Sequence, residues 1–444
     1  MACKASRAPF LQNIAKRGLS AVSCPRAVGQ TADFESCVLG NKVVVAAANS
    51  FLPVTRVSIV FRAGARNESY DSQGASHMLR IALGLGTKNS TGFAITRNIQ
   101  QVGGSLTATS DREIVSYTVE TTSDQIEVGL RYLQDVIEPT FKPWELSDSI
   151  GRVKYQVASV PPQVRAVELM HKAAFRTGLG NSIYIPKFQI GKLSSECLQH
   201  FVANNFTGNR CAVVGVGIDH NTLSGFAQSL DLPTGSQSKS VNASYYGGDI
   251  RKDTPGDKAH VAVCGQGAAL LSQKEALAFA VLQHAVGSGT STKYGNINGS
   301  FGKALSAAVG NENVSYASLN ASYSDAGLFG FIVSADSDVI CKAVAGLTGA
   351  LKSGSVSDED FNRGKALLKT AVLESYSTDS SLINEIGLQA ILTKQILTID
   401  NLIAAIESLQ LKDVQDAAKK VAGSKLSMGA VGNLGSVPYI SELS

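Results

Sequence analysis

One short segment of this chain has the spacing of a zinc site but not its residues. Zinc peptidases with the pattern His-x-x-Glu-His bind the metal through two imidazoles on one helix, and the carboxylate between them acts as general base. The corresponding residues here are His77-Met78-Leu79-Arg80-Ile81. An arginine therefore occupies the place of the base, and an isoleucine occupies the place of the second ligand.

The chemistry of these replacements argues against metal binding. Catalytic zinc needs three protein ligands and an open position for water, and Arg80 remains cationic at physiological pH, so it repels a divalent ion. Loss of a general base alone costs on the order of 10²–10⁴ in rate. We therefore predict no catalytic, metal-binding or cofactor-binding residue in this segment, and we read His77 as a packed histidine.

The other residues that bind metals or redox groups are scattered. The seven cysteines include no Cys-x-x-Cys pair, which favours free buried thiols over a zinc ribbon, and no haem-attachment or iron–sulfur pattern is present. The six histidines are dispersed in sequence: His77, His171, His200, His220, His260 and His284. The sequence predicts no cofactor.

The first 33 residues differ in composition from the rest of the chain. The first acidic residue is Asp33, and residues 6–17 can form a basic amphipathic helix. This pattern is typical of a mitochondrial transit peptide, which we assign to residues 1–33 together with a flexible N-terminus. The chain of 444 residues has a net charge of +4, which gives no support for nucleic-acid binding. No apolar run is long enough to span a bilayer.

The remaining sequence divides into two similar halves. We predict an N-terminal domain at 34–230, a linker at 231–257 that is rich in turn formers, and a C-terminal domain at 258–444. Strand-like runs precede helical periodicity in each half, and a helical stretch is expected from Arg152 to Phe175. We expect an α+β fold of two homologous domains, each a mostly antiparallel sheet with helices packed on one side, forming a bowl-like half.

Several segments resemble one family. The chain is similar, over about residues 34–440, to the mitochondrial processing peptidase and insulinase-like metallopeptidases and to the respiratory-chain core proteins descended from them. The segments that carry the resemblance are Gly74–Thr87, His171–Arg176, Ile190–Leu193, Asn320–Gly330 and Gly432–Gly435.

The resemblance implies further active-site positions, and this chain departs from the family at most of them. Active members use a distal glutamate as third zinc ligand, and an ungapped comparison places it near Val153. They also hold substrate through an arginine and a tyrosine of the C-terminal half. Tyr316 stands at the tyrosine position, but Glu312 stands at the arginine position. The resemblance therefore implies an inactive metallopeptidase homologue with no catalytic residue.

The resemblance to the core proteins implies a structural, non-catalytic role in assembly and stability of the ubiquinol–cytochrome c reductase of the respiratory electron transport chain. Its implied partners are core subunit 1, cytochrome b, cytochrome c1 and the other subunits of that dimeric complex, on the matrix side of the mitochondrial inner membrane. The alternative is the non-catalytic, presequence-binding subunit of a processing peptidase. That subunit has a glycine-rich loop, and the comparable residues 287–295 contain no consecutive glycines. A free peptide-binding matrix protein is a third possibility.

Overall fold

The computed structural model describes most of the chain after the N-terminal segment. The described residues are 34–48, 52–233, 242–287, 289, 299–310, 312–394 and 396–443. The expected transit peptide at 1–33 lies outside them, as do residue 288 and residues 290–295 of the loop compared with the glycine-rich segment. The described cysteines are free, and among them Cys341 is exposed, whereas Cys211 and Cys264 are buried as expected.

The N-terminal half is built on a six-stranded sheet in the order β1-β2-β6-β3-β5-β4. Its strands are β1 (Phe34–Val38), β2 (Val44–Ala48), β3 (Val54–Phe61), β4 (Ser105–Ser110), β5 (Val115–Thr122) and β6 (Cys211–Val216). The β2–β6 pair is parallel, and the other pairs are antiparallel. The prediction of a mostly antiparallel sheet is confirmed for this half.

The C-terminal half repeats this plan with a five-stranded sheet in the order β7-β11-β8-β10-β9. Its strands are β7 (Gly248–Asp253), β8 (Lys258–Gln266), β9 (Ser315–Ser322), β10 (Gly327–Asp336) and β11 (Ser427–Gly432). Strand β7 pairs in parallel with β11. It lies inside the expected linker 231–257, so the linker is shorter than predicted. The turn formers Gly247 and Pro255-Gly256 bound this short strand and do not exclude it.

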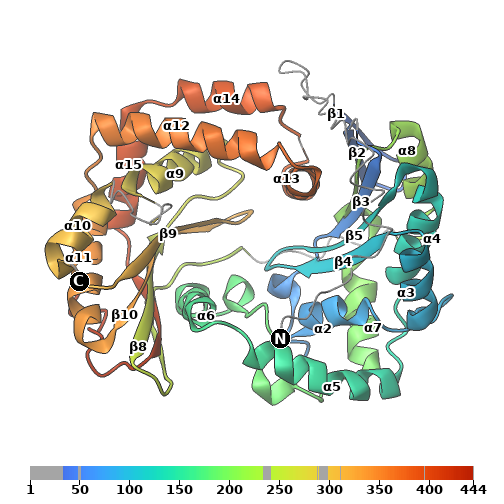
Figure 1. Cartoon of the computed structure of the whole chain (residues 1–444), viewed down its shortest axis with the longest axis horizontal. Helices are drawn as coiled ribbons and strands as arrows, with labels where there is room; N and C mark the ends of the chain where they lie inside the picture. The colour runs from blue at the N-terminus through green and yellow to red at the C-terminus, as the bar shows by residue number, and fades with distance from the viewer. Residues whose placement is uncertain are drawn as a thin grey trace, which may run out of the picture.

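Helices cover the outer face of each sheet (Figure 1). Those of the N-terminal half are α2 (Ala75–Ala82), α3 (Gly92–Gln101), α4 (Ile126–Val136), α5 (Pro143–Ala158), α7 (Ser195–Asn205) and α8 (His220–Ser229). Those of the C-terminal half are α9 (Gln273–Val286), α10 (Ser300–Val309), α11 (Ser337–Ser353), α12 (Asp358–Ser375), α14 (Ile399–Ser408) and α15 (Leu411–Ala422). None of the described helices has both the length and the apolar character needed to cross a membrane.

Two helices each pack on the sheet of the other half, an arrangement that the sequence did not predict. Helix α6 (Pro162–Phe175), from the N-terminal half, packs on the second face of the C-terminal sheet, and α13 (Asp379–Leu392) packs on the second face of the N-terminal sheet (Figure 1). The expectation of helices on one side of each sheet is therefore wrong for both sheets. Strand β2 is buried along its whole length, and such uninterrupted apolar strands are typical of sheets covered on both faces.

The helical stretch expected from Arg152 to Phe175 is not one helix. It divides into α5 and α6 at Pro161-Pro162, because proline lacks an amide donor and disfavours helical geometry in the residue before it. Helix α6 then lies very close to strand β11. A Cβ atom added at Gly429 would lie 2.2 Å from the carbonyl oxygen of Ala166, so this contact requires a glycine.

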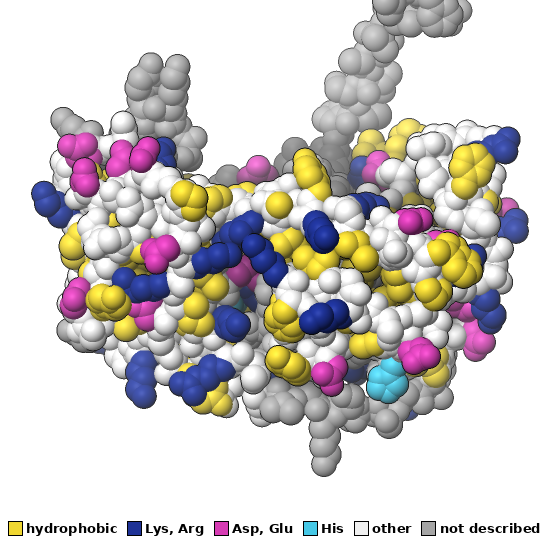
Figure 2. Space-filling model, turned by 90° about the horizontal axis from the view of Figure 1, so that it is seen from below, with side chains coloured by type: hydrophobic (Ala, Val, Ile, Leu, Met, Phe, Trp, Pro, Cys, Tyr) yellow, Lys and Arg dark blue, Asp and Glu magenta, His cyan; other side chains and the backbone are white. Residues whose placement is uncertain are grey.

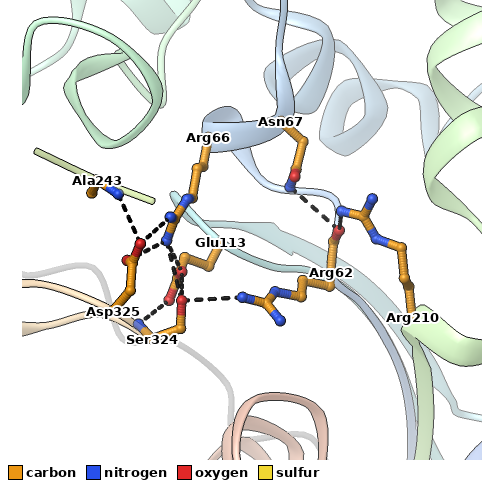
Figure 3. Close-up of polar contacts among 8 residues, drawn as sticks. All are labelled: Arg62, Arg66, Asn67, Glu113, Arg210, Ala243, Ser324 and Asp325. Carbon is orange, nitrogen blue, oxygen red and sulfur yellow. Dashed lines mark hydrogen bonds and ion pairs between the residues drawn. The ribbon is translucent and has the colours of Figure 1, made fainter. Parts of the chain in front are cut away.

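The tip of the β9–β10 hairpin inserts into the N-terminal half and joins the halves through buried charges (Figure 3). Both Asp325 oxygens accept from the Arg66 guanidinium, at 2.7 and 2.5 Å. Glu113 accepts from the backbone N–H of Ser324 at 2.9 Å and from its hydroxyl at 2.6 Å. Arg66 also donates to Glu113 at 2.8 Å. We call Arg66, Glu113, Ser324 and Asp325 the junction cluster.

A second contact between the halves joins α6 to the same hairpin. His171 is buried, and its Nδ1 donates to the Val167 carbonyl at 2.8 Å because a carbonyl can only accept. Its Nε2 therefore accepts from the Tyr323 hydroxyl at 2.8 Å. Burial and the charge of Arg112 lower the pKa of His171 well below its usual value, which keeps the ring neutral.

Removal of the Tyr323 hydroxyl tests this contact. We expect Tyr323→Phe to lower the free energy of unfolding by about 1–2 kcal/mol, because His171 Nε2 would be left buried without a donor. Urea denaturation of the variant measures this loss. Tyr155→Phe, at a side chain that is 73% exposed, is the matched control and should have little effect. Equal effects of the two substitutions would contradict the assignment.

Candidate functional site

The histidine helix α2 begins at an unusual cap. Its N-cap residue Gly74 has a positive φ of 91°, and a Cβ at this position would lie 2.4 Å from the Ile185 side chain. The Glu68 carboxylate takes the place of a capping side chain. It accepts from the backbone N–H groups of Gly74 and Ser76, both at 2.8 Å, and from the Ser76 hydroxyl at 2.7 Å. Burial raises the pKa of Glu68 to about 7, although these hydrogen bonds oppose the shift.

His77 is fully buried, and both of its ring nitrogens are engaged. The Ile185 backbone N–H donates to Nδ1 at 3.3 Å, and Nε2 lies 2.9 Å from Gln156 Oε1. Arg80 also donates to Gln156 Oε1, at 3.3 Å. Because guanidinium groups only donate, the amide oxygen faces both residues, and His77 Nε2 must carry the proton. The neutral ring therefore has no free lone pair for a metal ion.

The electrostatics of the pocket keep the ring neutral. The pKa of His77 is lowered to about 4, chiefly by burial and also by the charge of Arg80, whereas the hydrogen bond to Gln156 opposes the shift. Tyr184 packs edge-on against the ring, with 5.8 Å between ring centroids. These contacts agree with the prediction that His77 is a packed histidine.

The partner of His77 on α5 is Gln156. Val153 is 2% exposed and belongs to the hydrophobic core of the N-terminal half. Gln156 lies three residues, almost one helical turn, further along the helix and faces the histidine. Gln156 is therefore the side chain near Val153 that meets the histidine. Glutamine has the shape of glutamate but carries no charge, so it can accept from His77 and Arg80 without attracting a cation.

The remaining predicted positions do not complete a catalytic site. Ile81 is 1% exposed and packs in the N-terminal core. Tyr316 is buried in the core of the C-terminal half, where burial raises its pKa, and Glu312 is exposed just before β9. Among the described residues, no group of three or more His, Cys, Asp and Glu side chains is placed to hold a metal ion.

The low pKa of His77 predicts a specific dependence of stability on pH. Between pH about 6.5 and 4 the unfolded chain binds a proton at His77 that the folded chain does not bind, so stability falls as the pH falls through this window. His77→Gln can keep both hydrogen bonds without titrating. We expect it to reduce the slope of unfolding free energy between pH 6 and 5 by about 1.2 kcal/mol per pH unit.

The measurement is urea denaturation over that pH range. His200→Gln, at an exposed histidine of α7, is the control and should leave the slope unchanged. A His77→Gln variant with the same slope as the unmodified protein would show that the ring is not held neutral.

Comparison with protein families gives matches over both halves. A model of the insulinase family (peptidase family M16) matches residues 43–187, and a model described as the peptidase M16 inactive domain matches residues 192–368. The chain is 37% identical over 422 residues to "Cytochrome b-c1 complex subunit 2, mitochondrial" of Rattus norvegicus, and 35% identical to the protein of that name from Homo sapiens. Each match covers 93% of both chains.

More distant similarity reaches processing peptidases. The chain is 28% identical over 417 residues to "Probable mitochondrial-processing peptidase subunit alpha-1" of Arabidopsis thaliana, a match that covers 91% of this chain and 83% of that one. Among solved structures, a chain of "Complex III2 from Candida albicans, Inz-5 bound" has the same fold. The TM-score is 0.78 at 18% identity, with coverage of 92% of this chain and 98% of that chain.

Proposed function

The chain belongs to the insulinase (peptidase M16) family, and we propose that it is core subunit 2 of the mitochondrial ubiquinol–cytochrome c reductase, complex III. Its role is structural: it supports assembly and stability of the complex and carries no redox cofactor. Identity of 35–37% to cytochrome b-c1 complex subunit 2 of mammals, over 93% of each chain, supports this proposal.

The observation that best supports a non-catalytic role is the closed environment of His77. In place of His-x-x-Glu-His this chain has His77-Met78-Leu79-Arg80-Ile81, and the side chain that faces His77 from α5 is the neutral Gln156. Both ring nitrogens of His77 are hydrogen-bonded within the protein. Arg80 would repel a metal ion and cannot act as a general base. The remaining groups supply neither zinc ligation nor base catalysis.

The proposed location is the matrix side of the mitochondrial inner membrane, reached through the transit peptide at 1–33. The proposed partners are core subunit 1, cytochrome b, cytochrome c1 and other subunits of the dimeric complex. Large side chains that a protein normally buries are exposed on the described surface, and aromatic groups of this kind often anchor interfaces. They include Tyr70 (73% exposed), Phe93 (76%), Trp144 (65%), Leu271 (69%) and Tyr439 (59%).

Affinity purification from gently solubilised mitochondrial membranes tests the proposal. We expect the tagged chain to comigrate on native gels with b- and c-type haem in an assembly of several hundred kilodaltons. A haem-free soluble heterodimer that stimulates presequence cleavage would contradict it and favour the alternative, the presequence-binding subunit of a processing peptidase. A free monomer that binds peptides would contradict both.

A further inference from the structure

A basic cavity lies between the two halves, beside the histidine helix but separate from the ring of His77. Its volume is about 300 Å³, which is within the range of small-ligand sites. One side is a face of helix α6, a second is the segment 180–188, and Lys252 of strand β7 closes the third. Each half of the molecule therefore contributes to it.

The charge of this cavity is strongly positive. Five basic side chains line it against two carboxylates, which gives a net charge of +3; the basic residues are Arg165, Lys172, Arg176, Lys187 and Lys252. Lys and Arg side chains gather near the middle of the face of the molecule seen from below (Figure 2). Residues 1–33 carry five basic side chains and one acidic one, which equals the net charge of +4 of the whole chain. The remaining chain is neutral overall, so the cavity is a local excess of positive charge.

The two carboxylates do not neutralise the lysines, because other groups already use them. Glu168 pairs with the Arg112 guanidinium and accepts from the Ile183 N–H at 3.1 Å. Glu68 caps helix α2. Arg165 is also engaged, since it donates to the last two carbonyls of α5, those of Val157 and Ala158, and to the Val160 carbonyl just after the helix.

The three lysines remain available for a ligand. Within the described part of the chain, the ammonium groups of Lys172, Lys187 and Lys252 have no ion pair or hydrogen bond. Neighbouring cations disfavour the positive charge on Lys252. Burial lowers the pKa of Lys252, and the charges of Arg165 and Lys187 lower it further. An anion among these groups would relieve that repulsion.

Arg176 lies at the edge of the cavity, in a strained backbone conformation that positions its side chain. Arg176 has φ 62° and ψ −54°, and Thr177 N–H donates to the Phe175 carbonyl at 2.7 Å. This is a γ-turn of the rare, strained type. It holds the guanidinium 4.4 Å from the ring centre of Tyr246, which fixes the direction of the charge.

The rest of the lining is mixed, and it includes the polar residues Gln73, Asn181 and Ser182 as well as apolar side chains. Val160, Ile185 and Phe188 contribute to the wall, and Phe188 stacks on the exposed Tyr70 ring with 6.1 Å between centroids. A ligand that fits this cavity therefore has a compact, multiply charged anionic group and an apolar or aromatic portion. Lysine is a common phosphate ligand in proteins.

We propose that the basic cavity binds a small phosphate-bearing ligand, with its phosphate among Lys172, Lys187 and Lys252 and its apolar portion against Ile185 and Phe188. The same chemistry is offered by a soluble organic phosphate and by the headgroup of an anionic phospholipid. A basic peptide is disfavoured, because five cations surround the site. The proposal does not depend on membership of complex III.

Calorimetric titration of the purified full chain with sodium pyrophosphate and with magnesium-free ATP tests binding of a soluble phosphate. Sedimentation with phosphatidylcholine vesicles, with and without phosphatidic acid, tests binding of a phospholipid headgroup. Since the three lysines are exposed, substitution by glutamine should not disturb folding. We expect each single substitution to weaken binding about tenfold, and the triple variant to weaken it at least about 100-fold.

The matched control is the triple variant Lys303→Gln/Lys342→Gln/Lys412→Gln, which removes the same charge at exposed positions of the C-terminal half. It should bind like the unmodified protein. Binding of pyrophosphate or ATP that the cavity variant loses supports the proposal with a soluble ligand. Binding only of phosphatidic acid vesicles, lost in the same variant, supports it with a lipid. No binding of either, or equal weakening by both triple variants, would overturn it.

Discussion

Replacement of Arg66 by methionine is expected to lower the free energy of unfolding by about 3–5 kcal/mol, the largest single loss we predict for this protein. The Arg66 side chain is 7% exposed and forms ion pairs with Glu113 at 2.8 Å and with Asp325 at 2.5 Å. Without the guanidinium, Glu113 would remain as a buried charge with only the Ser324 donors. Burial disfavours the charge on Asp325, yet Arg66 holds the pKa of Asp325 below its usual range.

Denaturant unfolding of Arg66→Met measures this loss. Lys274→Met is the control, because Lys274 is 69% exposed and pairs with Asp413 at 2.8 Å on the surface; it should cost about 0–1 kcal/mol. The double variant Arg66→Met/Asp325→Leu should recover part of the loss, since it removes a carboxylate left unpaired. A loss of less than about 1 kcal/mol in Arg66→Met would show that the junction cluster does not stabilise the fold.

Restoration of zinc binding is the second large effect that we expect, and it requires three substitutions. Arg80→Glu with Ile81→His completes the helix motif but leaves Gln156 opposite His77. Addition of Gln156→Glu supplies a carboxylate at the position that now lies 2.9 Å from His77 Nε2. We expect the triple variant to bind zinc at least about a hundredfold more tightly than the double variant, because zinc sites need three protein ligands.

Equilibrium dialysis against zinc compares the two variants, and thermal unfolding with and without zinc provides a second measurement. Ile81 is 1% exposed, so Ile81→His will cost stability in both variants, and the comparison cancels that cost. Val153→Glu in place of Gln156→Glu is the control for the position of the third ligand. Equally tight zinc binding by the double variant, or by the Val153→Glu control, would contradict the assignment of Gln156.

Some predictions from the sequence depend only on local spacing. Arg80 and Ile81 stand three and four residues after His77, on one helix face, where the resemblance places the base and the second ligand. The α+β fold with two mostly antiparallel sheets is confirmed. The break between α5 and α6 was missed, although Pro161-Pro162 was a sufficient signal for it.

Other features depend on pairs of residues that are far apart in the chain. Gln156 is 79 residues from His77, and an ungapped comparison cannot fix the register of helix α5 against α2. The junction cluster joins Glu113 to Ser324 across 211 residues. Strands β2 and β6 are buried along their whole length, and no local pattern states which helix covers their second face.

The sequence by itself determined that an arginine and an isoleucine follow His77 by three and four residues on one helix face, because side-chain identity and helical spacing are local. Only the tertiary structure decided which groups surround that histidine. It brings Gln156 against His77, exchanges α6 and α13 between the halves, and gathers lysines from two halves around one cavity. Burial and charge act through space, so groups remote in sequence set the chemistry of each site.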